Sequence, residues 1–131
     1  MGTGISYLAL SEKDAVRARQ MYELGDYNAC GRFCEQSVEK SLKAFIEQNG
    51  SSEDIPLMTL HRPRRLYERC CALGLGPLDP ALALSLSVFS EYYYDTNYPG
   101  ASYFELTKLQ AEDALALTDR VNLAVRARMD E

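Results

Sequence analysis

The amino-acid sequence predicts an all-α protein, a five-helix antiparallel up-and-down bundle. Apolar residues recur three and four positions apart in five segments, and turn-forming residues separate these segments. No segment alternates apolar and polar residues with a period of two, so we expect no β-strand. Connections of about two to ten residues favour antiparallel neighbours. With 131 residues and no internal repeat, the chain is expected to form a single domain over residues 1–131.

The first two helices carry start and stop signals. Ser11 followed by Asp14 resembles a capping box, which predicts that a helix begins at Ser11 and ends at Gly25. Asp26 is placed to cap a second, longer helix that ends at Gly50. The expected apolar stripe of this second helix comprises Cys30, Phe33, Cys34, Val38, Leu42 and Phe45, and its expected polar side comprises Gln36, Glu39, Lys40, Lys43 and Glu47.

A loop and a third helix follow. Residues 51–60 are polar at first and then apolar, and we expect them to form a loop. Pro63 suits the first turn of the third helix, because the N–H group that proline lacks has no helical partner there. The apolar spacing carries this helix to Leu73.

The fourth and fifth helices complete the predicted bundle. Asp79 and Pro80 are typical of a helix start, with an N-cap residue followed by proline at the first helical position. The fifth helix is expected to begin near residues 102–105, to direct Leu109 inward, and to fray after Arg126.

Composition and charge narrow the class of protein. No apolar run approaches the roughly 20 residues that a membrane span needs, and we expect no contact with a membrane. The first residues lack the basic start of a secretory signal, so we expect a cytoplasmic protein. The net charge of −5 argues against a protein that coats nucleic acid along its whole surface.

The cysteine spacing argues against a metal site. Cys30 and Cys34 lie four residues apart on a predicted helix, whereas Cys70 and Cys71 are adjacent. Four ligands of a zinc ion must converge tetrahedrally, and adjacent helical residues face different directions. We therefore interpret the cysteines as small buried side chains and expect neither a metal nor another cofactor.

A basic cluster beside the single histidine is the first candidate site. His61 is followed by Arg62, Arg64, Arg65 and Arg69. Guanidinium groups match the geometry of phosphate oxygens, and Arg64 and Arg65 are the candidates for an anion site. His61 could contact a phosphate or carry a proton. The alternatives are a solvated arginine face and a histidine that caps the third helix.

The second candidate is the segment EYYYDTNYPG, residues 91–100. Consecutive tyrosines on a helix lie about 100° apart, so they cannot share one face. We expect Tyr92 to be in the core, whereas Tyr93 could stack on a base or pack across a dimer interface. Asn97 and Tyr98 either face a ligand or belong to an ordinary turn.

Three stretches of this chain resemble HEPN domains, in the order that this family shows. The segment GDYNACGRFCEQSVEKSLKAFI, residues 25–46, is similar to the signature helix of the family, with Glu39, Lys40, Lys43 and Ala44 in place. Thr59, Leu60 and His61 look like the start of the family's third helix, and Tyr98 with Pro99 looks like its closing Tyr-Pro segment. The resemblance implies a helical bundle that forms a homodimer.

Two kinds of activity follow from the resemblance. Some HEPN proteins are metal-independent RNases, in which a dimer joins two motifs of arginine followed by histidine after four to six residues. Others resemble the helical partner of a minimal nucleotidyltransferase and are thought to help bind a nucleotide. The two proteins are often encoded as a pair, and some pairs behave as toxin and antitoxin.

This sequence departs from the RNase pattern. The motif would require an arginine near residues 54–57, and none is present. Asn97 also stands where the family usually has an arginine before Tyr-Pro. We therefore expect no catalytic residue and predict a non-catalytic binding module that takes a nucleotide or an RNA phosphate and pairs with a nucleotidyltransferase. The alternatives are a metal-independent endoribonuclease toxin that uses His61 and a purely structural dimeric adaptor.

Overall fold

The computed structural model describes residues 6–97, 100 and 103–129, and for residues 90–97 it describes the backbone only. Within these ranges every regular element is helical, which confirms the all-α class. The elements are α1 (Tyr7–Glu23), α2 (Tyr27–Asn49), the 3-10 helix η1 (Ser52–Thr59), α3 (Pro63–Cys70), the π-helical turn η2 (Cys71–Leu75), α4 (Pro80–Asn97) and α5 (Lys108–Met129). None of the described helices is long and apolar enough to cross a membrane.

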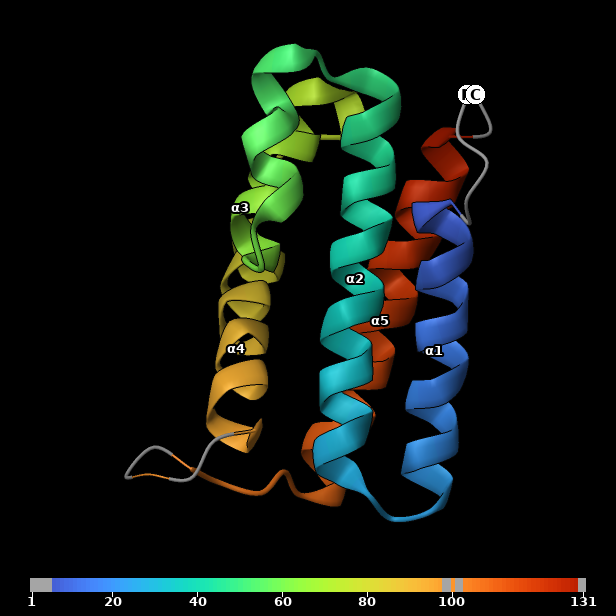
Figure 1. Cartoon of the computed structure of the whole chain (residues 1–131), viewed down its shortest axis with the longest axis vertical. Coiled ribbons are helices and arrows are strands. Elements are labelled where there is room, and N and C mark those ends of the chain that lie inside the picture. Colours follow the sequence, from blue (N-terminus) through green and yellow to red (C-terminus); the bar gives the residue numbers. More distant parts are fainter. Residues whose placement is uncertain (1–5, 98–99, 101–102, 130–131) are drawn as a thin grey trace.

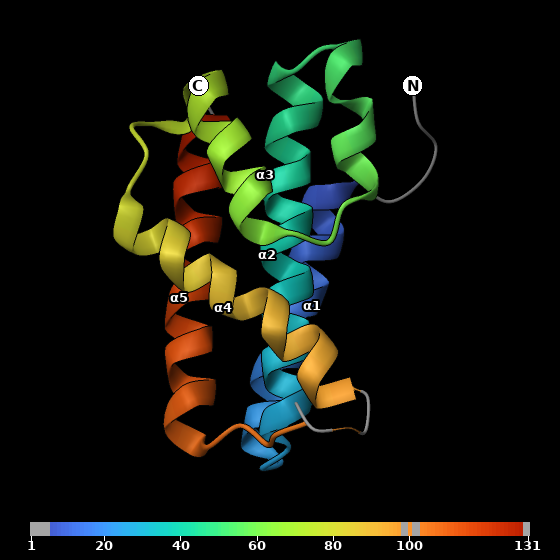
Figure 2. The same cartoon turned by 90° about the vertical axis from the view of Figure 1, so that its left-hand side faces the viewer.

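The helices run alternately down and up when η1 is included, so α2 and α3 point in the same direction (Figure 1). The helix α2 lies at the centre and contacts α1, α3, α4 and α5. Turned by 90°, the structure shows α4 crossing obliquely in front of α2 and α5, while α3 and η1 flank the upper part of α2 (Figure 2). The strict count of five helices is not reproduced, because η1 and η2 add two short helical segments to the described part of the chain.

The position of α2 explains which of its residues are buried. Leu42 and Val38 are inaccessible to solvent and belong to a core that also contains Leu66, Leu86 and Val125. A helix that is surrounded on several sides must also bury polar side chains. For this reason the expectation that the second helix has a solvated polar side is wrong at two of its positions, which are Glu39 and Lys43.

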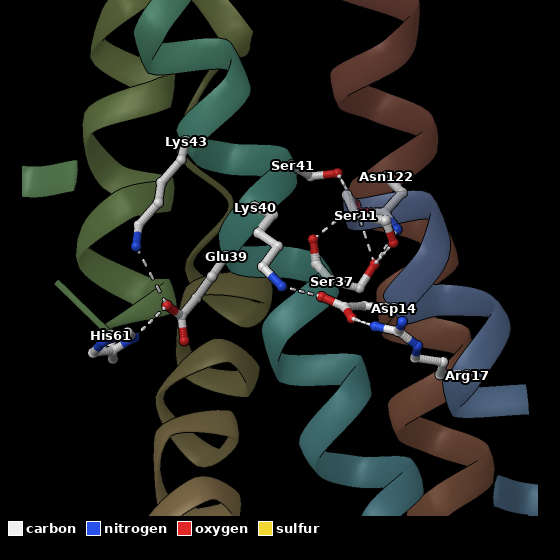
Figure 3. A network of polar contacts seen from close by, with 10 residues as sticks. All are labelled: Ser11, Asp14, Arg17, Ser37, Glu39, Lys40, Ser41, Lys43, His61 and Asn122. Atoms are coloured by element: carbon white, nitrogen blue, oxygen red, sulfur yellow. Dashed lines mark hydrogen bonds and ion pairs between the residues drawn. The ribbon is translucent and has the colours of Figure 1, made fainter. Parts of the chain in front are cut away.

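A buried polar network joins α1, α2 and α5 (Figure 3). The Ser11 hydroxyl donates to the Ser37 carbonyl over 2.8 Å and lies 2.9 Å from the Ser41 hydroxyl. The Ser41 hydroxyl donates to Asn122 Oδ1 over 2.6 Å, and Asn122 Nδ2 donates to the Ser37 hydroxyl over 2.9 Å. Because every buried polar atom of this group has a partner, the network fixes how the three helices align.

The ends of several helices differ from the sequence-based expectation. The helix α1 begins at Tyr7 with Ser6 as its N-cap, so the predicted capping role of Ser11 is wrong. Residues 51–60 contain η1 instead of a loop. The last helix begins at Lys108, later than expected, because the Thr107 hydroxyl accepts from the Gln110 amide and caps it there.

Other predicted ends are confirmed. The Asp26 side chain accepts from the Ala29 amide and caps α2. Asp79 Oδ1 accepts from the Leu82 amide, and Pro80 is the first residue of α4. The prediction that Leu109 points inward is wrong, because this side chain is 66% exposed. The buried stripe of α5 runs through Ala111, Ala114 and Val121, and Leu109 lies off that stripe.

Candidate anion-binding groove

A groove of about 710 Å³ lies at the start of α3, and one of its walls comes from α4. The chain arrives there from η1 through Leu60 and His61, and α4 contributes Ser87. The groove is lined by Thr59, Leu60, His61, Arg62, Arg64, Arg65, Glu68 and Ser87. Three of these eight residues are arginines, and one is an acid, so the lining carries a local positive charge on a chain whose net charge is negative.

The N-terminus of α3 opens into this groove. Arg62 is the N-cap residue of α3 and makes no side-chain capping hydrogen bond, and Pro63 follows at the first helical position. The N–H groups in the first turn of a helix have no partner inside the helix. Together with the positive end of the helix dipole, the amides of Arg64 and Arg65 favour a bound anion.

The arginines of the cluster have different partners. Arg69 faces away from the groove and binds Asp54 through Nε at 2.7 Å and Nη2 at 3.2 Å. Arg64 Nε lies 3.3 Å from Glu68 Oε2. For Arg62 and Arg65, the described residues supply no hydrogen bond or ion pair to the side chain, so these two guanidinium groups face the groove with their charge uncompensated.

His61 is held by a buried carboxylate from α2 (Figure 3). Its Nδ1 lies 3.0 Å from Glu39 Oε1, and the two residues are 22 positions apart in the sequence. The histidine side chain is 62% exposed, whereas that of Glu39 is 5% exposed. Lys43 Nζ approaches the same carboxylate oxygen at 3.7 Å. The carboxylate therefore fixes the orientation of the imidazole, which lines the groove.

The Glu39 carboxyl is subject to opposing effects. Burial raises the pKa of Glu39 above its ordinary value, because the charged form loses its hydration. The hydrogen bond from His61 and the positive charge of Lys43 act in the opposite direction and favour the carboxylate. Removing either partner would therefore leave a buried charge with less compensation.

A second buried acid lies one helical turn away. Glu35 is inaccessible to solvent, and among the described residues neither of its carboxyl oxygens has a hydrogen-bond partner. It is four residues before Glu39, so both acids project from the same side of α2. The two acids therefore differ in their partners among the described residues, although both are buried on one helix.

The structure brings together three of the six predicted ligand residues. His61, Arg64 and Arg65 line one groove. Tyr93 and Asn97 belong to α4, but their side chains lie outside the described residues, as does Tyr98 as a whole. The side chain of Tyr92, which is predicted to be in the core, also lies outside the described residues.

Glu68, Glu39 and Ser87 take part in the site and were not predicted. Glu68 could have been found, since it lies four positions after Arg64 on one helix and therefore on the same face. The contact between Glu39 and His61 depends on the path of η1, and the contribution of Ser87 depends on the crossing of α4. Neither of these has a signal in the local sequence.

The cysteines lie apart from the groove. Cys30 and Cys34 are buried on α2, and the Cys70 thiol donates to the Leu42 carbonyl over 3.3 Å. Burial raises the pKa of the Cys70 thiol above its ordinary range. Within the described ranges, no three histidine, cysteine or acidic side chains gather in an arrangement that could hold a metal ion.

Comparison with known proteins agrees with the geometry of the bundle. The family model of the HEPN domain matches residues 7–127. The crystal structure of an archaeal HEPN homologue superposes with a TM-score of 0.69 at 19% sequence identity, covering 93% of this chain and 93% of that one. Among curated protein sequences, none matches this chain.

Proposed function

This chain belongs to the HEPN domain family, and from that premise we propose that it is a non-catalytic module that binds a nucleotide or an RNA phosphate in the groove at the start of α3. In this proposal the module is the helical partner of a minimal nucleotidyltransferase and works as a homodimer. His61, Arg64 and Arg65 line the groove and are its proposed contacts, and Arg62 joins them. Tyr93, Asn97 and Tyr98 remain proposed contacts from the following segment.

The observation that supports the proposal best is the coincidence of three anion-binding features. Arg62 and Arg65 line the groove, and the described residues supply them with no acidic partner. The first-turn amides of α3 lack a side-chain cap. His61 lines the groove beside them and can add a third cationic donor when it is protonated. Charge-assisted hydrogen bonds of this kind are the ones that hold phosphate oxygens most strongly.

Isothermal titration calorimetry with ATP tests the proposal. We expect saturable binding to the wild-type protein and at least tenfold weaker binding to Arg62→Ala/Arg65→Ala, because each guanidinium contributes a charge-assisted contact. The matched control is Lys13→Ala/Arg19→Ala, which removes the same charge from exposed positions on α1. If the wild-type protein gives no heat with ATP or with a short RNA, the proposal is wrong.

The paired His61 supports one alternative, a metal-independent endoribonuclease. An imidazole oriented by a buried carboxylate can exchange a proton with a ribose hydroxyl. Labelled RNA incubated with the protein in the presence of a chelator tests this alternative. Cleavage by the wild-type protein that His61→Ala abolishes would support it, whereas RNA that stays intact at high protein concentration would exclude it.

A further inference from the structure

Glu68 is the one acid among the described residues that line the cationic groove. It lies on α3 three positions after Arg65 and four after Arg64. Residues three and four apart on a helix are neighbours on its surface, with Cβ atoms about 5–6 Å apart. A ligand whose anion binds Arg65 therefore has the carboxylate of Glu68 close by.

The carboxylate of Glu68 is positioned through Arg64. Arg64 Nε donates to Glu68 Oε2 over 3.3 Å, and Arg64 Nη1 donates to the Ser87 hydroxyl on α4 over 3.3 Å. The same Ser87 hydroxyl donates to the Ala83 carbonyl over 3.4 Å, so it acts both as an acceptor from Arg64 and as a donor within α4. No hydrogen bond to Glu68 Oε1 is found among the described residues, and this oxygen is an acceptor on the groove wall.

We propose that Glu68 accepts hydrogen bonds from sugar hydroxyls, so that the groove takes a ribonucleotide with its phosphate on Arg62 and Arg65 and its ribose on Glu68. This inference rests on the proposed function, since it concerns the same groove. A carboxylate repels a phosphate but accepts from vicinal hydroxyls, and an acidic residue recognises ribose in this way in dinucleotide-binding sites. The part of the ligand beside Glu68 should therefore be an uncharged hydroxyl-bearing group, and its phosphate should lie on the arginine side of the groove.

Glu68 must give up part of its contact with Arg64 in order to accept from a sugar hydroxyl, and the exposure of this ion pair allows that change. The side chains of Arg64 and Glu68 are 50% and 44% exposed, and an exposed pair of this kind contributes little to stability. Glu68 can therefore reorient toward a hydroxyl at little cost. The groove of about 710 Å³ falls within the range of pockets that enclose a ligand of nucleotide size.

The test compares AMP with dAMP, and CMP with dCMP, by calorimetry. The measured quantity is the ratio of the two dissociation constants, because a change in overall charge affects both ligands alike. For the wild-type protein we expect the ribonucleotide to bind about fivefold to tenfold more tightly with either base. In Glu68→Ala this ratio should fall to about one, while binding of both nucleotides is retained. Glu47→Ala, which removes an exposed acid from α2, should keep the wild-type ratio.

The outcomes separate this inference from the proposed function. Equal affinities of AMP and dAMP for the wild-type protein would overturn the inference and leave phosphate binding in place. A ratio that persists in Glu68→Ala would overturn the role of Glu68. If no nucleotide binds to the wild-type protein, both the inference and the nucleotide-binding function fail.

Discussion

Replacing the two buried acids of α2 should shift stability in opposite directions. Glu35 and Glu39 lie one turn apart and are both buried, but the described part of the chain supplies partners to Glu39 alone. Glu35→Met keeps the length of the side chain and removes two oxygens that have no hydrogen-bond donor. Burying a polar group without a partner costs roughly 1–3 kcal/mol, so we expect the free energy of unfolding to rise by about this amount.

Glu39→Met should have the opposite effect. It leaves Lys43, whose side chain is 8% exposed, without the carboxylate that compensates its charge. Breaking a buried ion pair by removing one partner costs about 3–5 kcal/mol, and the distance of 3.7 Å between Lys43 Nζ and Glu39 Oε1 favours the lower end. The two variants should therefore differ by at least about 4 kcal/mol, the sum of the two effects at their lower ends.

Urea denaturation at neutral pH, followed by circular dichroism, measures both variants against the wild type. Glu35→Gln is the control, since it removes the carboxyl but keeps a polar group without a partner, and it should gain less stability than Glu35→Met. A Glu35→Met protein that is less stable than the wild type would show that this carboxyl is compensated. A Glu39→Met protein as stable as the wild type would show that the contact with His61 and Lys43 contributes nothing.

Three further predictions concern other parts of the fold. Asn122→Ala should lower the free energy of unfolding by about 2 kcal/mol, as it removes two buried hydrogen bonds to the serine network, and urea denaturation measures this. Gly50→Ala should also destabilise the protein, because an added Cβ would lie 2.7 Å from the Ile46 carbonyl, and a fall in the melting temperature checks it. The Arg69 guanidinium and the Ser51 amide lower the pKa of Asp54 below its ordinary 3.8, so its stabilising contribution is present above that pH and is lost as the pH falls through the lowered value. Asp54→Asn should flatten this part of a plot of stability against pH.

Local signals in the sequence were sufficient to predict a helix end where that end depends only on neighbouring residues. Asp26 and Asp79 cap helices as predicted, because a carboxylate before a run of helix-forming residues needs only the backbone that follows it. The same logic was wrong at Ser11. Ser6 already caps this helix by accepting from the Ala9 amide, so Ser11 lies inside the helix. Its hydroxyl donates to the Ser37 carbonyl on the neighbouring helix, a contact that only the packed structure creates.

Long-range contacts explain the rest of what the sequence did not reveal. A charged residue on a central helix looks solvated when only its own helix is considered, so the sequence pattern places Glu39 on the polar side although it is buried. Its burial depends on η1 turning the chain back, so that His61 returns to α2. The basic cluster was visible in the sequence, but the separation of Arg69 from the groove required the position of Asp54.

The most direct test of anion binding at the start of α3 is a titration of the isotopically labelled protein with AMP, followed by amide chemical shifts. The account predicts that the largest shifts occur at the backbone amides of Arg64 and Arg65, whose N–H groups would donate to the phosphate. Inorganic phosphate should move the same two signals in the same direction. Shifts confined to other helices, or no shifts at all, would contradict the assignment of this groove as the binding site.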